Sequence, residues 1–102
     1  MIIHKHNSFT FEWHEEKAEL NFTKHQISFD EAMTVFEDSL AIYSDDEIHS
    51  ITEERAHIIG MTSLFKLVTI SFTDRDDIIR LINARKATKK ERKYYESQNK
   101  YN

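Results

Sequence analysis

The chain has 102 residues, of which 39% are apolar and 31% charged, and its net charge is −4. This composition fits one small globular domain over residues 1–102, and the lack of cysteine excludes disulfides and thiolate catalysis. With no proline and only one glycine, Gly60, the chain has no glycine-rich phosphate loop, which argues against ATP-dependent chemistry.

The net charge conceals a segregation along the chain. Residues 1–79 carry six basic and sixteen acidic side chains, a balance of −10, whereas residues 80–102 carry eight and two, a balance of +6. A basic end on an acidic body steers an anionic ligand or neutralises an acidic partner, and a solvated basic helix is the alternative. No stretch approaches the roughly 18 apolar residues of a membrane span, so we expect a soluble, cytoplasmic protein.

The first half of the chain predicts a strand and two helices. Phe9–Trp13 alternates large apolar with polar side chains, as a half-buried strand does, and residues 1–8 precede it as an N-terminal extension. Apolar side chains then recur at helical spacing over residues 15–25. Ser28 and Glu31 have the spacing of a capping box, which predicts a second helix from that point.

The second half predicts four strands and a basic helix. We place the strands at residues 40–43, 55–62, 66–73 and 77–85, with a polar loop at 44–54. The third has one apolar and one polar face, which is typical of an antiparallel sheet covered on one side. Thr88 and Glu91 repeat the capping-box spacing before a helix to about Gln98, and residues 99–102 fray. The order β-α-α-β-β-β-β-α predicts an α+β fold with helices mainly on one face.

Two arginines in the last predicted strand are candidates for binding phosphate, because a guanidinium group offers a charged, planar pair of donors. Regular alternation places Arg80 and Arg85 on opposite faces of the strand. Either a bulge or the end of the strand near Arg85 would bring them together, and bulges often occur beside active sites. The alternative interpretation is that each arginine forms an ion pair with the acidic body.

Lys24 and His25 end the first predicted helix, where the helix dipole favours cations, so their position has a structural explanation. The functional interpretation is that the imidazole transfers a proton while the lysine binds a phosphate. Glu54 and Arg55 present a similar choice between proton transfer with charge stabilisation and a plain salt bridge.

Two other patterns have weaker support. The acidic run at residues 45–47 with His49, and the pair His4 and His6, contain metal-ligating residue types, but their spacing matches no recognised site. We therefore expect no metal, with the first group in a solvated loop and the second in a mobile terminus. In the basic tail, tyrosines interleave with lysines, which suits single-stranded nucleic acid, unless a tyrosine simply docks the helix.

Read together, these motifs resemble the BrnT family of type II toxins, small ribonucleases paired with a BrnA antitoxin. The likeness runs from about Phe11 to Tyr95. It rests on Phe11-Glu12-Trp13 with Lys17 and Asn21, Lys24-His25 with Ser28-Phe29-Asp30-Glu31-Ala32, Phe36 and Asp38, Glu54-Arg55 with Ile59-Gly60, and the run from Arg80 to Thr88 with Glu91.

The resemblance implies a RelE-like fold and cofactor-free, metal-independent RNA cleavage that blocks translation and arrests growth. It also implies neutralisation by a BrnA-like ribbon-helix-helix antitoxin, in a 2:2 complex that contacts DNA through the antitoxin. In such chemistry the RNA 2′-hydroxyl attacks its own phosphate, and the protein supplies proton transfer and charge stabilisation. The implied catalytic positions are Lys24, His25, Glu54, Arg55, Arg80 and Arg85, with RNA contacts at Asn83, Lys86, Lys89 and Lys90.

Three residues depart from the family pattern. His14 stands where an Asp usually caps the first helix, Gln26 replaces a Gly that eases a left-handed helix end, and Asn83 replaces a frequent Ser. The competing hypothesis is a degenerate toxin, a non-catalytic module whose basic C-terminal region binds RNA or an acidic partner.

Overall fold

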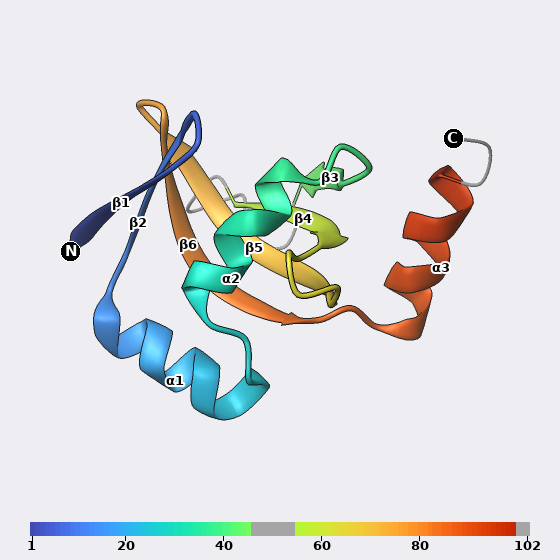
Figure 1. Cartoon of the computed structure of the whole chain (residues 1–102), viewed down its shortest axis with the longest axis horizontal. Coiled ribbons are helices and arrows are strands. Elements are labelled where there is room, and N and C mark those ends of the chain that lie inside the picture. Colours follow the sequence, from blue (N-terminus) through green and yellow to red (C-terminus); the bar gives the residue numbers. More distant parts are fainter. Residues whose placement is uncertain (46–54, 100–102) are drawn as a thin grey trace.

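The computed structural model describes residues 1–45 and 55–99. Figure 1 shows how the elements follow one another in space. In chain order they are β1 (Ile2–His6), β2 (Phe9–Trp13), α1 (Glu15–His25), α2 (Phe29–Met33), the 3₁₀ helix η1 (Thr34–Glu37), β3 (Ile42–Asp45), β4 (Ala56–Met61), β5 (Leu67–Arg75), β6 (Ile78–Lys86) and α3 (Lys89–Gln98). The predicted α+β class is confirmed.

All the strands belong to one six-stranded sheet, in the order β1-β2-β6-β5-β4-β3. Its neighbouring strands are antiparallel except for β2 and β6, which run parallel. The sheet is therefore mixed, where the sequence predicted an antiparallel one. Hairpin turns fix the direction of strands that are consecutive in the chain, but β2 and β6 are distant, so no local turn indicates their direction.

The sequence did not predict β1. Asn7 adopts the left-handed backbone conformation, with φ of 55°, which asparagine tolerates in tight turns. The chain reverses there and β1 pairs antiparallel with β2. The His4 ring lies face to face on the Trp13 ring, with centroids 3.8 Å apart. The terminus that we expected to be mobile is thus a strand of the sheet.

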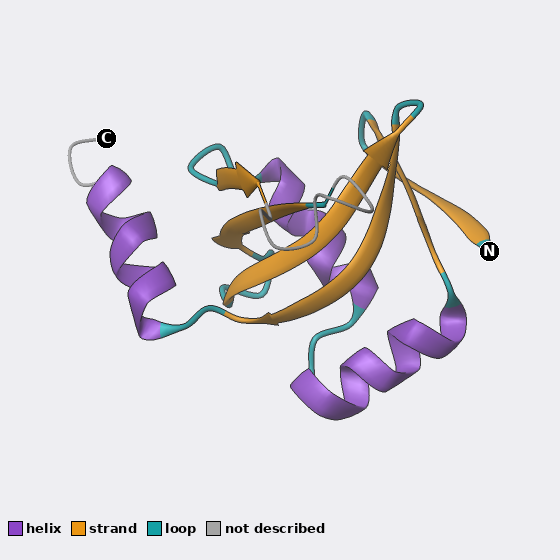
Figure 2. Ribbon diagram, turned by 180° about the vertical axis from the view of Figure 1, so that it is seen from behind, coloured by secondary structure: helices purple, strands orange, loops and turns teal. Residues whose placement is uncertain are grey.

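Helices α1 and α2 cover one face of the sheet, as predicted. Figure 1 shows α2 in front of the strands, and from behind, in Figure 2, the strands lie in front of α2. The side chains between these layers form the main core, and the large ones with almost no exposure include Phe11, Phe29, Ile58, Ile70 and Leu81. This core holds the central strands in place.

The helix α3 is docked separately. Its Tyr95 packs in a smaller cluster with Ile59 and Leu67, and the Tyr95 hydroxyl donates to Asp38 Oδ2 over 2.8 Å. Burial, together with the Asp38 carboxylate, raises the pKa of Tyr95 to about 12. Asp38 Oδ2 also accepts from the Met61 amide at 2.8 Å, so one carboxylate ties α3 to the end of β4. The interpretation that a tyrosine docks this helix is confirmed.

The two predicted capping boxes differ in outcome. Thr88 and Glu91 form a complete box at the start of α3. At α2 only half forms: the Glu31 amide donates to Ser28 Oγ at 3.0 Å, but the Glu31 side chain turns inward. There its Oε2 accepts from the Thr62 hydroxyl at 2.7 Å, and its Oε1 lies 3.3 Å from Lys66 Nζ. The β4–β5 turn therefore takes the carboxylate that the box would use.

Candidate functional site

A β-bulge in β6 decides which of its side chains share a face. Phe72 of β5 pairs with Leu81, but the preceding residue, Ser71, pairs with Asn83, so Ile82 is an extra residue in β6. One extra residue in a strand reverses the alternation of the side chains that follow it. Of the two features that would bring the arginines together, a bulge or the strand end, the structure has the bulge.

Three residues of β6, on both sides of the bulge, project from the same face of the sheet. Cross-strand partners point to the same side. Arg80, Asn83 and Arg85 pair with every second residue of β5, namely Thr73, Ser71 and Thr69. We call the side of β5 and β6 that carries them the arginine face; its members are Thr69, Ser71, Thr73, Arg80, Asn83 and Arg85. His57 of β4 pairs with Ser71 and so joins this face.

The arginine face lies on the side of the sheet away from α1 and α2, the side seen in Figure 2. We expected the centre of this side to be open. Instead Thr69 and Thr73 are each only 1% exposed, and Arg80 and Arg85, their partners, are half-buried. The backbone pattern alone therefore overestimated the exposure of this face.

Arg80 forms an ion pair across the parallel strand pair. Its Nε and Nη2 atoms donate to Glu12 Oε2 over 3.2 and 3.1 Å. Within the described residues its Nη1 has no partner, and 39% of the side chain is exposed. Because a guanidinium has five N–H donors, Arg80 retains donors for a ligand while Glu12 fixes its orientation.

Arg85 is held more completely. Its Nη1 and Nη2 atoms donate to Glu91 Oε1 and Oε2 over 2.7 and 3.0 Å, a bidentate pair. Glu91 Oε1 also accepts from the Thr88 amide at 2.8 Å, as part of the capping box. Both arginines therefore have the ion pairs that were the alternative interpretation. Their side chains are similarly accessible, 39% exposed for Arg80 and 33% for Arg85.

The electrostatics of Glu91 follow from this arrangement. Partial burial raises the pKa of its carboxyl group, but hydrogen bonds from Arg85 and the Thr88 amide outweigh this effect and lower the pKa to about 2. The Glu91 hydrogen bond, against the opposing effect of burial, also raises the pKa of Arg85. The pair is thus fully ionised at neutral pH.

Lys24 and His25 lie at the end of α1, beside the edge of β6. With Lys17, Asn21 and Asn83 they line a hollow of about 190 Å³. The structure therefore brings together Lys24, His25 and Asn83, which the sequence predicted separately. Lys17 was missed as a site residue, although Lys17, Asn21 and Lys24 have the i, i+4, i+7 spacing of one helical stripe.

Asn21 joins α1 to β6 just beyond the bulge. Its Nδ2 donates to the Ala84 carbonyl at 2.9 Å, and the Ala84 amide donates to its Oδ1 at 3.0 Å. Nδ2 also donates to the Ile27 carbonyl at 3.0 Å, and Asn21 is only 7% exposed. A side-chain amide thus takes the place of a neighbouring strand, and it fixes Lys24 and His25 relative to Asn83.

The two departures from the family pattern in α1 lie at its N-cap and its C-cap. His14, at the N-cap, makes no side-chain capping hydrogen bond. Gln26 adopts the left-handed conformation with φ of 58°, which costs a non-glycine residue roughly 1–2 kcal/mol. Its Nε2 donates to the Thr23 carbonyl at 3.0 Å. The helix still ends at the position where a glycine would end it, next to His25.

The remaining predicted residues are more dispersed. Arg55 is half-buried and immediately precedes β4. Lys86, Lys89 and Lys90 are exposed, the last two in the first turn of α3. Glu54 and most of the acidic loop with His49 lie outside the described residues. His4 and His6 face Glu15 and Glu37, with Nε2 to Oε1 distances of 3.9 and 2.9 Å.

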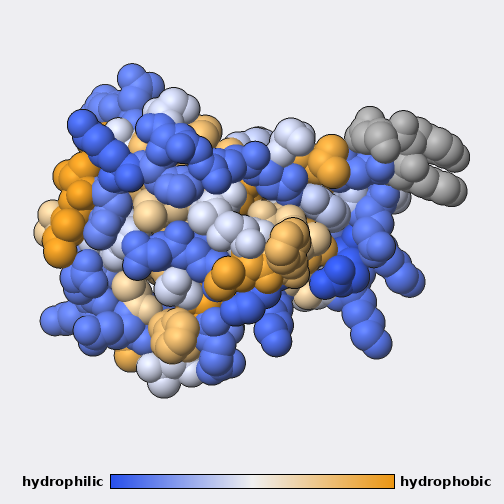
Figure 3. Space-filling model, viewed as in Figure 1, coloured by the Kyte–Doolittle hydropathy of each residue, from blue (hydrophilic) through white to orange (hydrophobic). Residues whose placement is uncertain are grey.

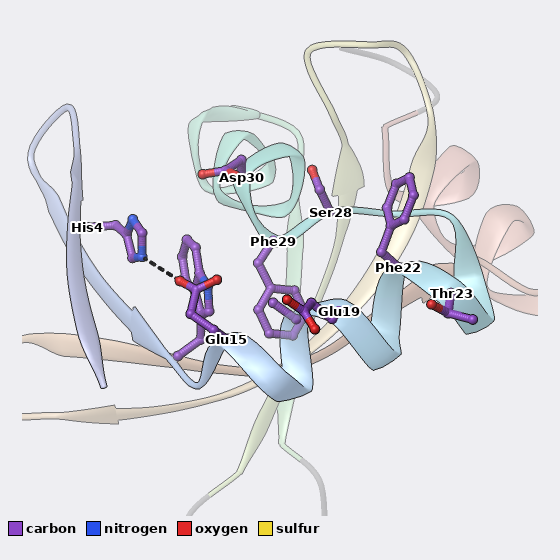
Figure 4. Close-up of a pocket in the computed structure, with 10 residues that line it drawn as sticks. His4, Glu15, Glu19, Phe22, Thr23, Ser28, Phe29 and Asp30 are labelled. Atoms are coloured by element: carbon purple, nitrogen blue, oxygen red, sulfur yellow. Dashed lines mark ion pairs between the residues drawn. The ribbon is translucent and has the colours of Figure 1, made fainter.

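A separate hollow of about 360 Å³ lies between β1, α1 and the start of α2 (Figure 4). Its lining includes Trp13 and Phe29 from the core and the carboxylates of Glu15, Glu19 and Asp30. Those carboxylates repel phosphate, so this hollow suits an anionic ligand less well than the one beside β6. Across residues 1–45 and 55–99, no three histidine or acidic side chains gather closely enough to hold a metal ion.

Fold and site together define a small α+β domain with cations gathered at one bulged strand, an arrangement suited to a polyanion. A family model described as the ribonuclease toxin, BrnT, of type II toxin–antitoxin systems matches residues 13–91, and the chain belongs to that family. The resemblance in the motifs is thereby confirmed. A comparison with curated proteins found no match. Among the described helices, none has the length and apolar character needed to cross a membrane.

Replacing Asn21 with Ala should destabilise the protein by about 2–4 kcal/mol, because the buried Ala84 amide and carbonyl lose their partner. The measurement is urea unfolding followed by circular dichroism. The comparison variant is Asn99→Ala, which removes a half-buried side-chain amide at the C-cap of α3. It should lower the free energy of unfolding by less than half as much as Asn21→Ala. Equal losses for the two variants would contradict the assigned role of Asn21.

The Glu91 pKa makes stability depend on pH in a defined window. A carboxyl group whose pKa falls from 4.5 to about 2 on folding stabilises the native state above pH 4.5, and this contribution disappears as the pH falls through 2. We expect Glu91→Gln to lower the free energy of unfolding by about 1–2 kcal/mol at pH 7, after allowance for solvent screening. The difference from the wild type should shrink below pH 4.5. If the difference in unfolding free energy between the wild type and Glu91→Gln is the same at pH 7 and pH 2.5, Glu91 does not make this contribution.

Proposed function

We propose that this chain is an endoribonuclease toxin that cleaves RNA without a metal ion, blocks translation and so arrests growth. Its membership of a ribonuclease toxin family supports the substrate class. The observation that carries the proposal is the bulge in β6. It puts Arg80, Asn83 and Arg85 on one face, while Asn21 holds Lys24 and His25 against the same strand.

The residues differ in the roles we assign to them. In cleavage by the RNA 2′-hydroxyl, negative charge develops on the phosphate oxygens and protons must leave and arrive. His25 is the candidate for proton transfer, because its imidazole lines the hollow next to Lys24. Lys24 and Arg80 stabilise the developing charge, Arg80 through the donors that Glu12 leaves unused.

We assign Arg85 an indirect role, in which it does not bind the phosphate itself. Glu91 engages both of its terminal nitrogens, so it contributes positive potential and a fixed strand end more than a free fork. Arg55 and Glu54 complete the catalytic set that the resemblance implies, and Asn83, Lys86, Lys89 and Lys90 contact RNA along the exposed basic end of the chain.

We further propose that a BrnA-like ribbon-helix-helix antitoxin neutralises this chain in the cytoplasm. The family description, which places the toxin in a type II toxin–antitoxin system, supports an antitoxin partner. A 2:2 complex that contacts operator DNA through the antitoxin is the form we expect.

The test is cleavage of a short labelled RNA by the purified full chain in the presence of EDTA. We expect cleavage to persist, and Arg80→Ala and Lys24→Ala each to slow it about 100-fold, the scale for loss of one charge-stabilising donor. Arg80→Ala and Arg85→Ala should each lower stability as well as activity, because they leave Glu12 and Glu91 without their partners. Rates are therefore compared under conditions in which each variant is folded by circular dichroism. Lys5→Ala, an exposed cation on β1, is the control for a general change in charge.

Two results would contradict the proposal. Activity that EDTA abolishes would show that a metal ion takes part. RNA that stays intact, but binds in a salt-sensitive way, would identify a non-catalytic binding module, since phosphate contacts release counterions.

A further inference from the structure

An exposed aromatic residue stands at the tip of the β4–β5 turn. Phe65 is 87% exposed, and its neighbour Leu64 is 63% exposed. Phe65 also has a left-handed backbone, with φ of 62°, an uncommon conformation for a bulky residue that costs on the order of 1–3 kcal/mol. No burial of the ring offsets that cost. Figure 3 shows apolar side chains at the surface near the middle of the view, with hydrophilic ones alongside.

Cations surround this ring. Phe65 lines a hollow of about 290 Å³ together with Lys66, Leu67, Lys86, Ala87 and Arg92, and none of these residues is acidic. Lys66 is occupied by Glu31, 3.3 Å away. In the part of the chain that the structure describes, neither Lys86 nor Arg92 has a carboxylate partner, unlike Arg80 and Arg85. Their positive charges are therefore available to a ligand.

We propose that this hollow is a subsite for single-stranded RNA, in which one base stacks on Phe65 while Lys86 and Arg92 contact the adjacent phosphates. Every base has a face that stacks on an aromatic ring, and single-strand sites combine such rings with cations. The proposal rests on the proposed function, because it assigns the bound strand to the RNA substrate. The apolar lining besides Phe65 consists of Leu67, which is buried, and Ala87, which is half-buried. A protein partner usually inserts several apolar anchors, so this small apolar surface suits a single flat base better.

The subsite continues the arginine face. Leu67 and Thr69 are two residues apart on the same side of β5, a separation of about 7 Å. Ala87 lies two residues beyond Arg85, and its amide donates to the Leu67 carbonyl over 3.0 Å. A strand of RNA on the arginine face therefore reaches Phe65 within a few nucleotides, outside the residues assigned to cleavage.

The experiment measures binding of a fluorescein-labelled, 12-nucleotide 2′-O-methyl RNA by anisotropy, with the full-length protein. The methyl groups block attack by the 2′-oxygen, so binding is separated from cleavage. We expect Phe65→Ala to weaken binding about tenfold, within the range found when a stacking aromatic is removed. Phe65→Tyr should bind like the wild type, because it keeps the ring. Leu64→Ala, an exposed neighbour that does not line the hollow, should have no effect.

A second pair of variants tests the phosphate contact. Arg92→Gln should weaken binding several-fold and lower the slope of log affinity against log salt by about one, as expected for one lost phosphate contact. Lys93→Gln removes the same charge from the next residue, which does not line the hollow. It should change the slope less than half as much.

The outcomes separate this proposal from the proposed function. Loss of affinity on Phe65→Ala, with no cleavage of unmodified RNA by the wild type, would support the subsite and contradict the proposed function. Cleavage of unmodified RNA with the same KM in the wild type and Phe65→Ala would overturn the subsite while the function stands. The subsite is also overturned if Phe65→Ala and Leu64→Ala bind alike, or if a polyglutamate peptide binds through Phe65 and the oligonucleotide does not.

Discussion

The extra residue in β6 is the constraint on which the arrangement of cations depends. With regular alternation, Arg85 would point into the core beneath α2, where an unpaired guanidinium is very costly. The bulge at Ile82 lets Leu81 and Ala84 both face that core while Arg80, Asn83 and Arg85 face the other way. One local irregularity therefore satisfies both the apolar packing and the gathering of positive charge.

The bulge would leave the edge of β6 open without Asn21. Strand β2 pairs with β6 only from Ile78 to Arg80, so the backbone beyond the bulge needs another partner. Asn21 supplies the donor and the acceptor that Ala84 requires. The same contact fixes the end of α1, and with it Lys24 and His25, so packing and the candidate chemistry share one hydrogen-bonding group.

The carboxylates opposite the arginines set the balance between structure and binding. Glu12 and Glu91 keep two cations ordered on a half-buried face, where leaving either charge unpaired would destabilise the protein. They also reduce the positive potential that RNA meets. Basic side chains without a carboxylate partner among the described residues lie beyond the end of β6, at Lys86, Arg92 and the start of α3. Weak, exposed phosphate contacts would therefore form there, while the paired arginines stay fixed in the sheet.

Sequence patterns predicted most of the elements because alternation, capping and helical spacing are local. Ser28 and Thr88 begin helices as predicted, and β6 differs from its predicted span by only one residue at each end. Long-range features were not predictable in the same way. The parallel pairing of β2 with β6 and the ion pairs of Arg80 and Arg85 depend on residues far apart in the chain or on turns without a distinctive sequence. The spacing of the two arginines suggested a bulge or a strand end between their faces, but it did not indicate that Ile82 would be the extra residue.

Lys24 on α1 and Arg80 on β6 have the same proposed role, which is to stabilise the negative charge that develops as RNA is cleaved. The most direct test is the single-turnover rate of RNA cleavage for Lys24→Ala, Arg80→Ala and the double variant. If both side chains stabilise one transition state as a unit, the double variant should be little slower than the slower single variant, because such residues are non-additive. If the rate reductions of the two single variants multiply in the double variant, or if the single variants cleave RNA as fast as the wild type, the two side chains do not share this role.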